Sequence, residues 1–379
     1  MADKYWLRRL WIATHRWVGL TAGLVLVVIG LTGSVSVFWR ELSQVFDARL
    51  AVENSGAPYR PYSEMIDAVN AEFPGRKHQW YFGLPWTDNG VIYAVDHDPP
   101  ERAGQYERPL YVAVDPFAAR VTTHYFWGET PVSWLYNLHS HLNAGPVGMT
   151  IVGVLGFLLL GLALSGLYLW WPITRFTLRQ FMTTTRDGYA RFEFDLHKVA
   201  GFYSLVLLSV LSISGIMLVF PEGSERVVSV FSEPSALERA EGEGPRSTPR
   251  PGAPAVTMDD AVVKALQLFP GARVRALMAP AAPEHSYGVI LQQPSEIFDP
   301  FYPRTEVWVD PWSGGILQVI DPNEQGAADR VLSIATPLHG GEAFGLTGRI
   351  LVCLTGFVPL LMFYTGLRQW LRKRSRATS

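Results

Sequence analysis

The chain has 379 residues, and its composition is not that of a soluble protein of this length. Hydrophobic residues make up 48% and charged residues only 17%, against roughly 25% charged in a typical soluble domain. The net charge of -2 offers no basic footprint for nucleic acid. The single cysteine, Cys353, excludes an internal disulfide, a cysteine-rich zinc module and covalent haem attachment. A membrane protein is indicated, and any reactive chemistry must rest mostly on its nine histidines.

Four uncharged runs are long enough to cross a bilayer, which takes about 20 helical residues. They predict membrane helices over 17–39, 148–171, 199–220 and 350–367. Tryptophans mark the ends of these runs, as an interfacial aromatic belt would. A cleaved signal peptide is disfavoured for the first run, because the run is too long for a signal core and no small-residue cleavage site follows before Arg40.

Lysine and arginine in the short flanks predict the orientation, because cytoplasmic flanks are enriched in these residues. The long segments then face the periplasm or the cell exterior, together with both outer domains. In chain order we predict a cytoplasmic N-terminus (1–16), a first membrane helix (17–39), a first outer domain (40–137), a second membrane helix with a histidine motif (138–171), a cytoplasmic loop (172–198), a third membrane helix (199–220), a second outer domain (221–337), a fourth membrane helix with a histidine motif (338–367) and a cytoplasmic tail (368–379).

The second half of the chain repeats motifs of the first at constant spacings, which indicates an internal duplication. His15 and His197 open the first and third runs and stand 182 positions apart, whereas His139 and His339 precede the second and fourth runs and stand 200 positions apart. Both repeats would enter and leave the membrane in the same sense, so we expect a pseudo-twofold axis along the membrane normal. Glycines repeat at the spacing of 200 as well: Gly145, Gly148, Gly156 and Gly166 match Gly345, Gly348, Gly356 and Gly366.

The two long segments also resemble each other. An amphipathic stretch ends in Phe-Pro-Gly at 73–75 and again at 269–271, which predicts a helix followed by a turn. Val-Asp-Pro at 114–116 and 309–311 follows β-branched and aromatic residues, as in a strand that enters a hairpin. Residues 242–254 are rich in proline and glycine and are interpreted as a flexible linker. The predicted fold class is therefore a membrane α-helical protein with four transmembrane helices, two periplasmic α+β domains and an internal duplication.

Histidine at the edge of a membrane span is costly unless it has a partner. The four repeated histidines form two groups according to their expected depth in the membrane. His15 and His197 lie at the predicted cytoplasmic ends, and His139 and His339 lie at the outer ends. The expected symmetry brings each pair towards the bundle axis at matching height. Two facing imidazoles suit the axial ligation of a haem iron, so we predict one haem near each surface, with these four histidines as the iron ligands.

Small and basic residues accompany the inner pair. Gly19 and Gly201 lie one turn after His15 and His197 on the same helix faces, where they would leave room for a flat macrocycle. Close helix packing is the alternative explanation for such glycines. Arg16 and Lys198 adjoin the two inner ligands and could neutralise haem propionates. Positive-inside anchoring explains them equally well.

Other metals suit the sequence less well. Zinc or copper would need three or four ligands, often including cysteine or carboxylate, and the predicted spans contain no Asp or Glu. The same absence weakens an ion-path transporter. His141 is about 200° around a helix from His139, and its repeat counterpart is Gly341. We therefore prefer His139 as the outer ligand and keep His141 as an alternative ligand or a substrate-side residue. The remaining histidines lack repeat partners and are interpreted as ordinary domain residues: His78, His97, His124 and His285.

The sequence resembles the PepSY-associated transmembrane family of bacterial iron-regulated inner-membrane proteins. The residues that carry the resemblance are His15-Arg16-Trp17-Val18-Gly19-Leu20, Leu138-His139, Asp195-Leu196-His197-Lys198, and Leu338-His339 through Gly345 to Gly348-Arg349. It covers nearly the whole chain, and within the family the chain looks similar to ferrisiderophore reductases of the FoxB type. The resemblance implies a multi-pass protein of the inner membrane, with cytoplasmic termini, PepSY-type domains in the periplasm and two b haems. His141 departs from the expected pattern.

The activity implied by the resemblance is the reduction of Fe(III) to Fe(II) in ferric hydroxamate siderophores such as ferrioxamine. A separate electron donor is expected, because no glycine-rich nucleotide-binding fingerprint is present. Two rival interpretations are a cofactor-free interaction or regulatory protein and a transporter of the chelate or its iron. Four tryptophans are candidates for lining the chelate dock, with core packing as the alternative: Trp80, Trp86, Trp127 and Trp134.

Overall fold

The computed structural model describes residues 6–54, 56–85, 87–171, 188–234, 244–250, 256–296 and 305–378. The chain divides into two compact units. One consists of Met1–Phe38, Leu135–Arg226 and Ile334–Ser379, and the other of Trp39–Trp134 and Val227–Ser333. We refer to them as the membrane unit and the outer unit.

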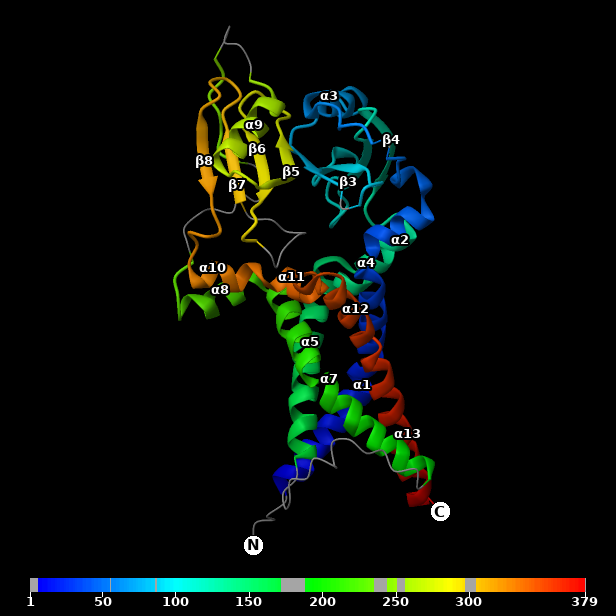
Figure 1. Cartoon of the computed structure of the whole chain (residues 1–379). Coiled ribbons are helices and arrows are strands. Elements are labelled where there is room, and N and C mark those ends of the chain that lie inside the picture. The colour runs from blue at the N-terminus through cyan, green and yellow to red at the C-terminus, as the bar shows by residue number, and fades with distance from the viewer. Residues whose placement is uncertain are drawn as a thin grey trace. The chain divides into compact units, whose positions relative to one another are not determined.

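The membrane unit is a bundle of long apolar helices, in which four helical segments are long and apolar enough to span a bilayer. They are α1 (Trp6–Ser36), α5 (Gly145–Trp170), α7 (Tyr189–Val219) and the pair α12 (Gly345–Thr355) and α13 (Val358–Thr378). Helices α1 and α7 each contact both α5 and α13, which closes a ring of four neighbours (Figure 1). Two short helices, α4 (Pro131–His141) and α11 (Ala335–Gly340), precede α5 and α12.

Glycine lets the first and last membrane helices approach closely. A Cβ atom on Gly356 would lie 2.4 Å from the carbonyl oxygen of Gly30, and one on Gly30 would lie 2.4 Å from the carbonyl oxygen of Gly356. Any side chain at either position would therefore separate the two backbones. Next to this contact, Ser34 Oγ donates a hydrogen bond of 2.7 Å to the carbonyl of Cys353. The break between α12 and α13 lies beside Pro359, which lacks an amide hydrogen.

The membrane helices are longer than the apolar runs that predict them. Helix α1 begins at Trp6 rather than at residue 17, and α7 begins at Tyr189 rather than at residue 199. Backbone hydrogen bonding continues through charged residues, so the end of an apolar run does not end a helix. Helix α7 carries two acidic residues, Glu193 and Asp195, in the extension that precedes the predicted span at 199–220. Both are buried and paired with cations: Glu193 lies 2.6 Å from Arg372 and Asp195 lies 3.1 Å from Lys198.

The outer unit is built on one antiparallel sheet of eight strands in the order β4-β3-β2-β1-β5-β6-β7-β8. Strands from the two long segments meet where β1 pairs with β5, with Trp80 opposite Ala279. The two predicted α+β segments thus share a single sheet. Their strands are β1 (Trp80–Gly83), β2 (Ile92–Asp96), β3 (Leu110–Asp115) and β4 (Arg120–Phe126), then β5 (Arg273–Ala279), β6 (Tyr287–Gln292), β7 (Thr305–Val309) and β8 (Ile316–Ile320).

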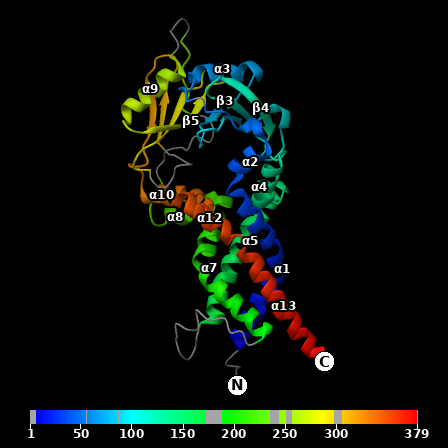
Figure 2. The ribbon, with the colours of Figure 1, turned by 45° about the vertical axis from the view of Figure 1, so that its right-hand side comes forward.

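Two helices cover the same face of this sheet, α3 (Tyr62–Glu72) and α9 (Met258–Leu268) (Figure 2). Each ends immediately before Phe73 or Phe269, which begin the Phe-Pro-Gly motifs. Met65 and Val69 of α3 and Ala261 of α9 join one core with alternate strand residues. The other elements of this part of the chain are short helices: α2 (Trp39–Phe46), η1 (Ala48–Leu50), η2 (Pro100–Arg102), α8 (Pro221–Ser229) and α10 (Ala327–Ser333), with η3 (Glu342–Phe344) before α12.

The boundary of the membrane unit differs slightly from the predicted domain limits. The outer unit ends at Trp134 and Ser333 rather than at residues 137 and 337, because α4 runs on from the sheet region to His141. Most of the predicted cytoplasmic loop (172–187) and part of the predicted linker (242–243 and 251–254) lie outside the described residues.

Candidate functional site

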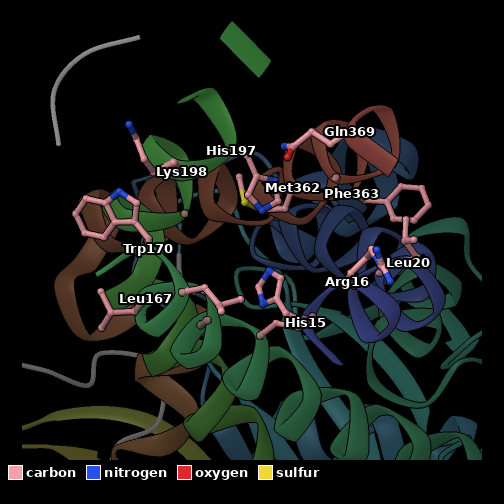
Figure 3. A pocket seen from close by; sticks show the side chains of 18 of the residues that line it. His15, Arg16, Leu20, Leu167, Trp170, His197, Lys198, Met362, Phe363 and Gln369 are labelled. Carbon is pink, nitrogen blue, oxygen red and sulfur yellow. The ribbon is translucent and has the colours of Figure 1, made fainter. Parts of the chain in front are cut away.

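The inner histidines face each other across the bundle. His15 projects from α1 and His197 from α7, and their ring centroids lie 6.5 Å apart with the ring planes at 77°. Figure 3 shows both side chains pointing into the same pocket from different helices. The sequence prediction that these two residues form a pair is therefore met in the geometry.

Each inner imidazole is held by a hydroxyl group on a neighbouring helix. His15 Nδ1 lies 2.8 Å from Ser165 Oγ of α5, and His197 Nδ1 lies 2.7 Å from Thr365 Oγ1 of α13. Both hydroxyls donate their own hydrogen to helix carbonyls, Ser165 to Leu162 and Thr365 to Leu361. They therefore accept from Nδ1–H, which leaves the lone pair of Nε2 on each ring for a ligand or metal.

A cavity of about 510 Å³ surrounds the inner pair. Such a volume is in the range of sites for cofactors and drug-sized ligands. Its walls come from α1, α5, α7 and α13 and are mostly apolar, with leucines, Met362 and Phe363 among them. Four cationic residues line it, and no acidic residue does among those the structure describes. The cations are Arg8, Arg16, Lys198 and Lys373. Such a site suits a large, flat, apolar molecule that carries anionic groups at one edge.

The two glycines predicted for this site lie on the cavity wall as expected, and two further glycines lie next to the histidine rings. Gly19 and Gly201 line the cavity, and a Cβ atom on either would meet only ordinary contacts, 3.8 Å from Leu162 and 3.7 Å from Met362. Gly166 and Gly366 lie directly against the imidazoles: a Cβ atom there would lie 3.3 Å from Cε1 of His15 and 3.8 Å from Cε1 of His197. These two glycines leave the histidine rings free to turn towards the cavity.

Both basic residues predicted beside the inner ligands line the cavity. The guanidinium of Arg16 lies 5.5 Å from the ring centroid of Trp17. Lys198 Nζ lies 3.1 Å from a carboxylate oxygen of Asp195, which is only 1% exposed. Asp195 thus fixes where this cation sits on the cavity wall.

The outer histidines form a second pair. His139 of α4 and His339 of α11 have ring centroids 6.0 Å apart, with the planes at 39°. Nδ1 of His139 lies 2.9 Å from the carbonyl oxygen of Ile29, and Nδ1 of His339 lies 3.1 Å from that of Leu211. A carbonyl oxygen only accepts, so Nδ1 carries the hydrogen in both rings and Nε2 is again left with its lone pair.

Two glycines make room for the outer pair. A Cβ atom on Gly33 would lie 2.7 Å from Cε1 of His139, and one on Gly215 would lie 2.9 Å from Cε1 of His339. Both distances are shorter than real carbon contacts allow, so a larger residue would displace the ring. Gly33 and Gly215 are therefore a steric requirement of the outer pair rather than general small-residue packing.

The spacing within each pair fits one six-coordinate metal between two imidazoles. An imidazole nitrogen binds a transition metal at about 2.0 Å and lies about 1.2 Å from the ring centre, so two opposed ligands place their centroids about 6.4 Å apart. The observed separations are 6.5 and 6.0 Å. In the described part of the chain, no group of three His, Cys, Asp or Glu side chains is placed to chelate a metal on its own. For the inner pair, two opposed imidazoles beside a macrocycle-sized cavity suit haem better than a fully protein-chelated zinc or copper ion.

His141 is not the residue that faces His339. It is buried, with 4% exposure, and the ring opposite His339 belongs to His139. The structure therefore brings His139, and not His141, together with His339. The four histidines interpreted as ordinary domain residues all lie in the outer unit: His78, His97, His124 and His285.

Of the four tryptophans proposed for a chelate dock, the three that the structure describes do not gather at one place. Trp80 is fully buried in the core under α3 and α9. Trp127 stacks on Tyr111 on the other face of the sheet, with centroids 5.0 Å apart, and Trp134 is 48% exposed. Trp86 lies outside the described residues. The three described tryptophans therefore do not form one shared wall.

The groups that orient the histidines were not predicted from the sequence, although the spacing of these groups along the chain is a usable signal. Ser165 and Thr365 stand 200 positions apart, and Ile29 and Leu211 stand 182 apart. These are the same two spacings that relate the histidines. A hydroxyl residue directly before the matched glycines at 166 and 366 was the available signal.

The sequence model of a family described as "PepSY-associated TM region" matches residues 12–373. No curated protein matches the chain.

Proposed function

This chain belongs to the PepSY-associated TM region family, and we propose that it is a membrane oxidoreductase with two non-covalently bound b haems. Its reaction would be one-electron reduction of Fe(III) to Fe(II) in a ferric hydroxamate siderophore. One observation carries the proposal. Two histidine pairs, each with Nδ1 already engaged by a hydroxyl or carbonyl, oppose their rings at 6.5 and 6.0 Å, as two axial ligands of one iron require.

The residues present would each have a defined task at these two sites. His15 and His197 would hold the inner haem, and His139 and His339 the outer one. Haem held by two histidines in this way would supply one-electron transfer rather than oxygen chemistry. The hydrogen bonds that Nδ1–H of each ring donates to Ser165, to Thr365 and to the two helix carbonyls would fix the rings and raise the basicity of Nε2.

The positive charge of the side chains that line the inner cavity would also favour the binding of haem. Arg8, Arg16, Lys198 and Lys373 line it, and a guanidinium or ammonium group pairs well with a carboxylate such as a propionate. The leucine-rich walls would exclude water from the macrocycle. The absence of a cysteine pair in the sequence agrees with non-covalent attachment.

The proposal includes an arrangement in the bacterial inner membrane. Both termini would be cytoplasmic, because basic residues concentrate in the flanks at that end, and the sheet-containing unit would lie in the periplasm. An internal duplication is part of the same proposal. It is supported by the contacts of the histidines, because partners at Ile29 and Leu211 and at Ser165 and Thr365 keep the spacings of 182 and 200.

The proposed substrate is a ferrioxamine-like ferric chelate, by likeness to the FoxB-type reductases. Such a chelate holds Fe(III) with hard oxygen ligands, and adding one electron to the iron weakens that hold without any acid–base residue. The electron would come from a separate donor, because the sequence carries no glycine-rich nucleotide fingerprint for a flavin or nicotinamide domain.

Absorption spectroscopy of the purified protein tests this function against the two rivals. The proposal predicts a Soret band that shifts on addition of dithionite and shifts back rapidly, in stopped flow, when ferrioxamine is added. A protein without a Soret band would support a cofactor-free interaction protein. A reducible haem protein that ferrioxamine does not reoxidise would keep the haem sites and contradict the siderophore-reductase activity.

A further inference from the structure

Helix α8 carries an apolar stripe that no other described residue covers well. Its side chains Val227 and, in the turn that continues it, Val230 and Phe231 are 65%, 78% and 86% exposed. Backbone hydrogen bonds from Phe231 and Ser232 to the carbonyl of Val228 extend the helical path past the last residue of α8. Soluble proteins rarely leave such side chains contiguous and bare.

The stripe and the charges of α8 lie on opposite faces. At 100° per residue, Val227, Val230 and Phe231 fall within about 100° of one another. Glu222, Glu225 and Arg226 fall on the opposite side, and Glu222 and Arg226 approach to 3.5 Å with both side chains more than four-fifths exposed. A helix with one bare apolar face and one charged face is typical of segments that lie in a membrane interface.

The position of α8 in the chain limits what can cover the stripe. Helix α7 is a candidate membrane span that ends at Val219, and α8 begins two residues later at Pro221. Phe220, the cap residue of α7, separates the two helices, and its ring packs on Phe157 of α5 at 6.2 Å. The stripe of α8 therefore follows directly on a candidate membrane span, and Phe231 is at most about 17 Å of helix away from the end of that span.

The chain leaves its first span in the same way. Helix α2 starts three residues after α1 ends, and its last residues Val45 and Phe46 are 79% and 67% exposed. Val45 and Val227 stand 182 positions apart, which is the spacing of the inner histidines. Exposed apolar side chains therefore follow both spans at equivalent positions, which chance exposure of a single loop would not explain.

We propose that α8 lies flat in the outer head-group layer of the bilayer, with Val227, Val230 and Phe231 at the boundary of the acyl chains. The occupant of the stripe is lipid rather than a second copy of the chain, because α8 follows directly on a candidate membrane span and its charged face points the other way. The interface layer is about 5 to 8 Å deep on each side of the hydrocarbon core, so a flat helix keeps all three side chains within it. This inference does not depend on the haem proposal.

Spin labelling of the full chain in lipid nanodiscs tests it, and the single cysteine makes the chain suitable. In a Cys353→Ala background, Phe231→Cys carries the label, and Glu225→Cys on the charged face of the same helix is the matched control. The label at 231 should collide several-fold more with oxygen than with a water-soluble nickel chelate, and the label at 225 should show the reverse preference. Equal, water-like exposure of both labels would overturn the proposal. Protection of the label at 231 from both reagents, with dipolar broadening between labels, would overturn it in favour of a dimer contact.

Discussion

Gly33 and His139 are in contact so close that the glycine has no room for a side chain: a Cβ atom at position 33 would lie 2.7 Å from Cε1 of the imidazole. Gly215 and His339 repeat this relationship at 2.9 Å. Each outer histidine is therefore wedged between a glycine and a carbonyl oxygen of the same neighbouring helix. These two contacts restrict the position of each ring, as the proposed role of a metal ligand with a fixed orientation requires.

Gly33→Ala should disrupt the outer pair and leave the inner pair intact. The added methyl group collides with the imidazole of His139, and overpacking of this kind costs typically about 1 to 3 kcal/mol. Haem content per chain should fall by about half, with a lower melting temperature. Gly161→Ala is the matched control, because a Cβ atom there would meet nothing within 4 Å, and it should behave as the wild type. Full haem content in Gly33→Ala would contradict the steric role.

Removing the hydroxyl behind an inner histidine should weaken inner haem binding. Thr365→Val deletes the acceptor for Nδ1–H of His197 but keeps the shape of the side chain, and loss of such a partner typically costs about 10- to 100-fold in metal affinity. Haem retention during dilution or competition with a haem-binding protein measures this loss. Thr365→Ser restores the hydroxyl and should recover most of the affinity. If Thr365→Val and Thr365→Ser retain haem equally, the hydroxyl has no orienting role.

Neutralising a cation of the inner cavity should lower the midpoint potential of the inner haem. Positive charge nearby stabilises the reduced, less positive state of the site, so Arg16→Gln removes part of that stabilisation. Redox titration should show one of two haem transitions moving to lower potential by tens of millivolts, with the other unchanged. Arg9→Gln alters an exposed residue that is not among those lining the cavity, and it should shift neither transition. A shift of both transitions in Arg16→Gln would mean a general surface-charge effect.

Stability of the outer unit should depend on pH through Glu306. Burial raises the pKa of this carboxyl above its ordinary value, although the indole N–H of Trp308 donates to it at 3.1 Å. A raised pKa means that the folded chain binds the proton more tightly than the unfolded chain. The contribution of Glu306 to stability is therefore full below its ordinary pKa and is lost as the pH rises through the raised value.

A variant of Glu306 tests the direction of this effect on the melting temperature. Glu306→Gln should melt at a higher temperature than the wild type at pH 8, because it removes the cost of a buried charge, and the difference should shrink towards pH 4. Glu53→Gln changes an exposed residue and should give no pH-dependent difference. A wild-type protein that melts at the higher temperature at pH 8 would contradict the assignment.

The pairing of the histidines could be predicted from the sequence because it depends on local signals. His15 and His197, and His139 and His339, have constant spacings and lie at equivalent ends of apolar runs. Partners that come from other helices were harder to find. The carbonyl oxygens of Ile29 and Leu211 carry no side-chain signature, and Ser165 and Thr365 look like ordinary small residues of membrane helices.

In the outer unit as well, local elements could be predicted from the sequence, whereas contacts between distant parts of the chain could not. The helices that end before Phe73 and Phe269 follow from local periodicity and a Pro-Gly stop. The pairing of β1 with β5 brings Trp80 opposite Ala279, almost two hundred residues later, and no local pattern encodes such a contact. The inner ends of α1 and α7 were missed for another reason: residues such as Glu193 and Asp195 end an apolar run, yet their charges are neutralised in place by Arg372 and Lys198.

The most direct test of the account is the number of haems per chain in the purified protein and in two variants, measured as the pyridine haemochrome. We predict two haems for the wild type and one each for His15→Ala and His339→Ala, with the electron paramagnetic resonance signal of the remaining haem different in the two variants. A wild-type chain without haem, or either variant with two haems, would contradict the assignment of His15 and His197 to one iron and of His139 and His339 to the other.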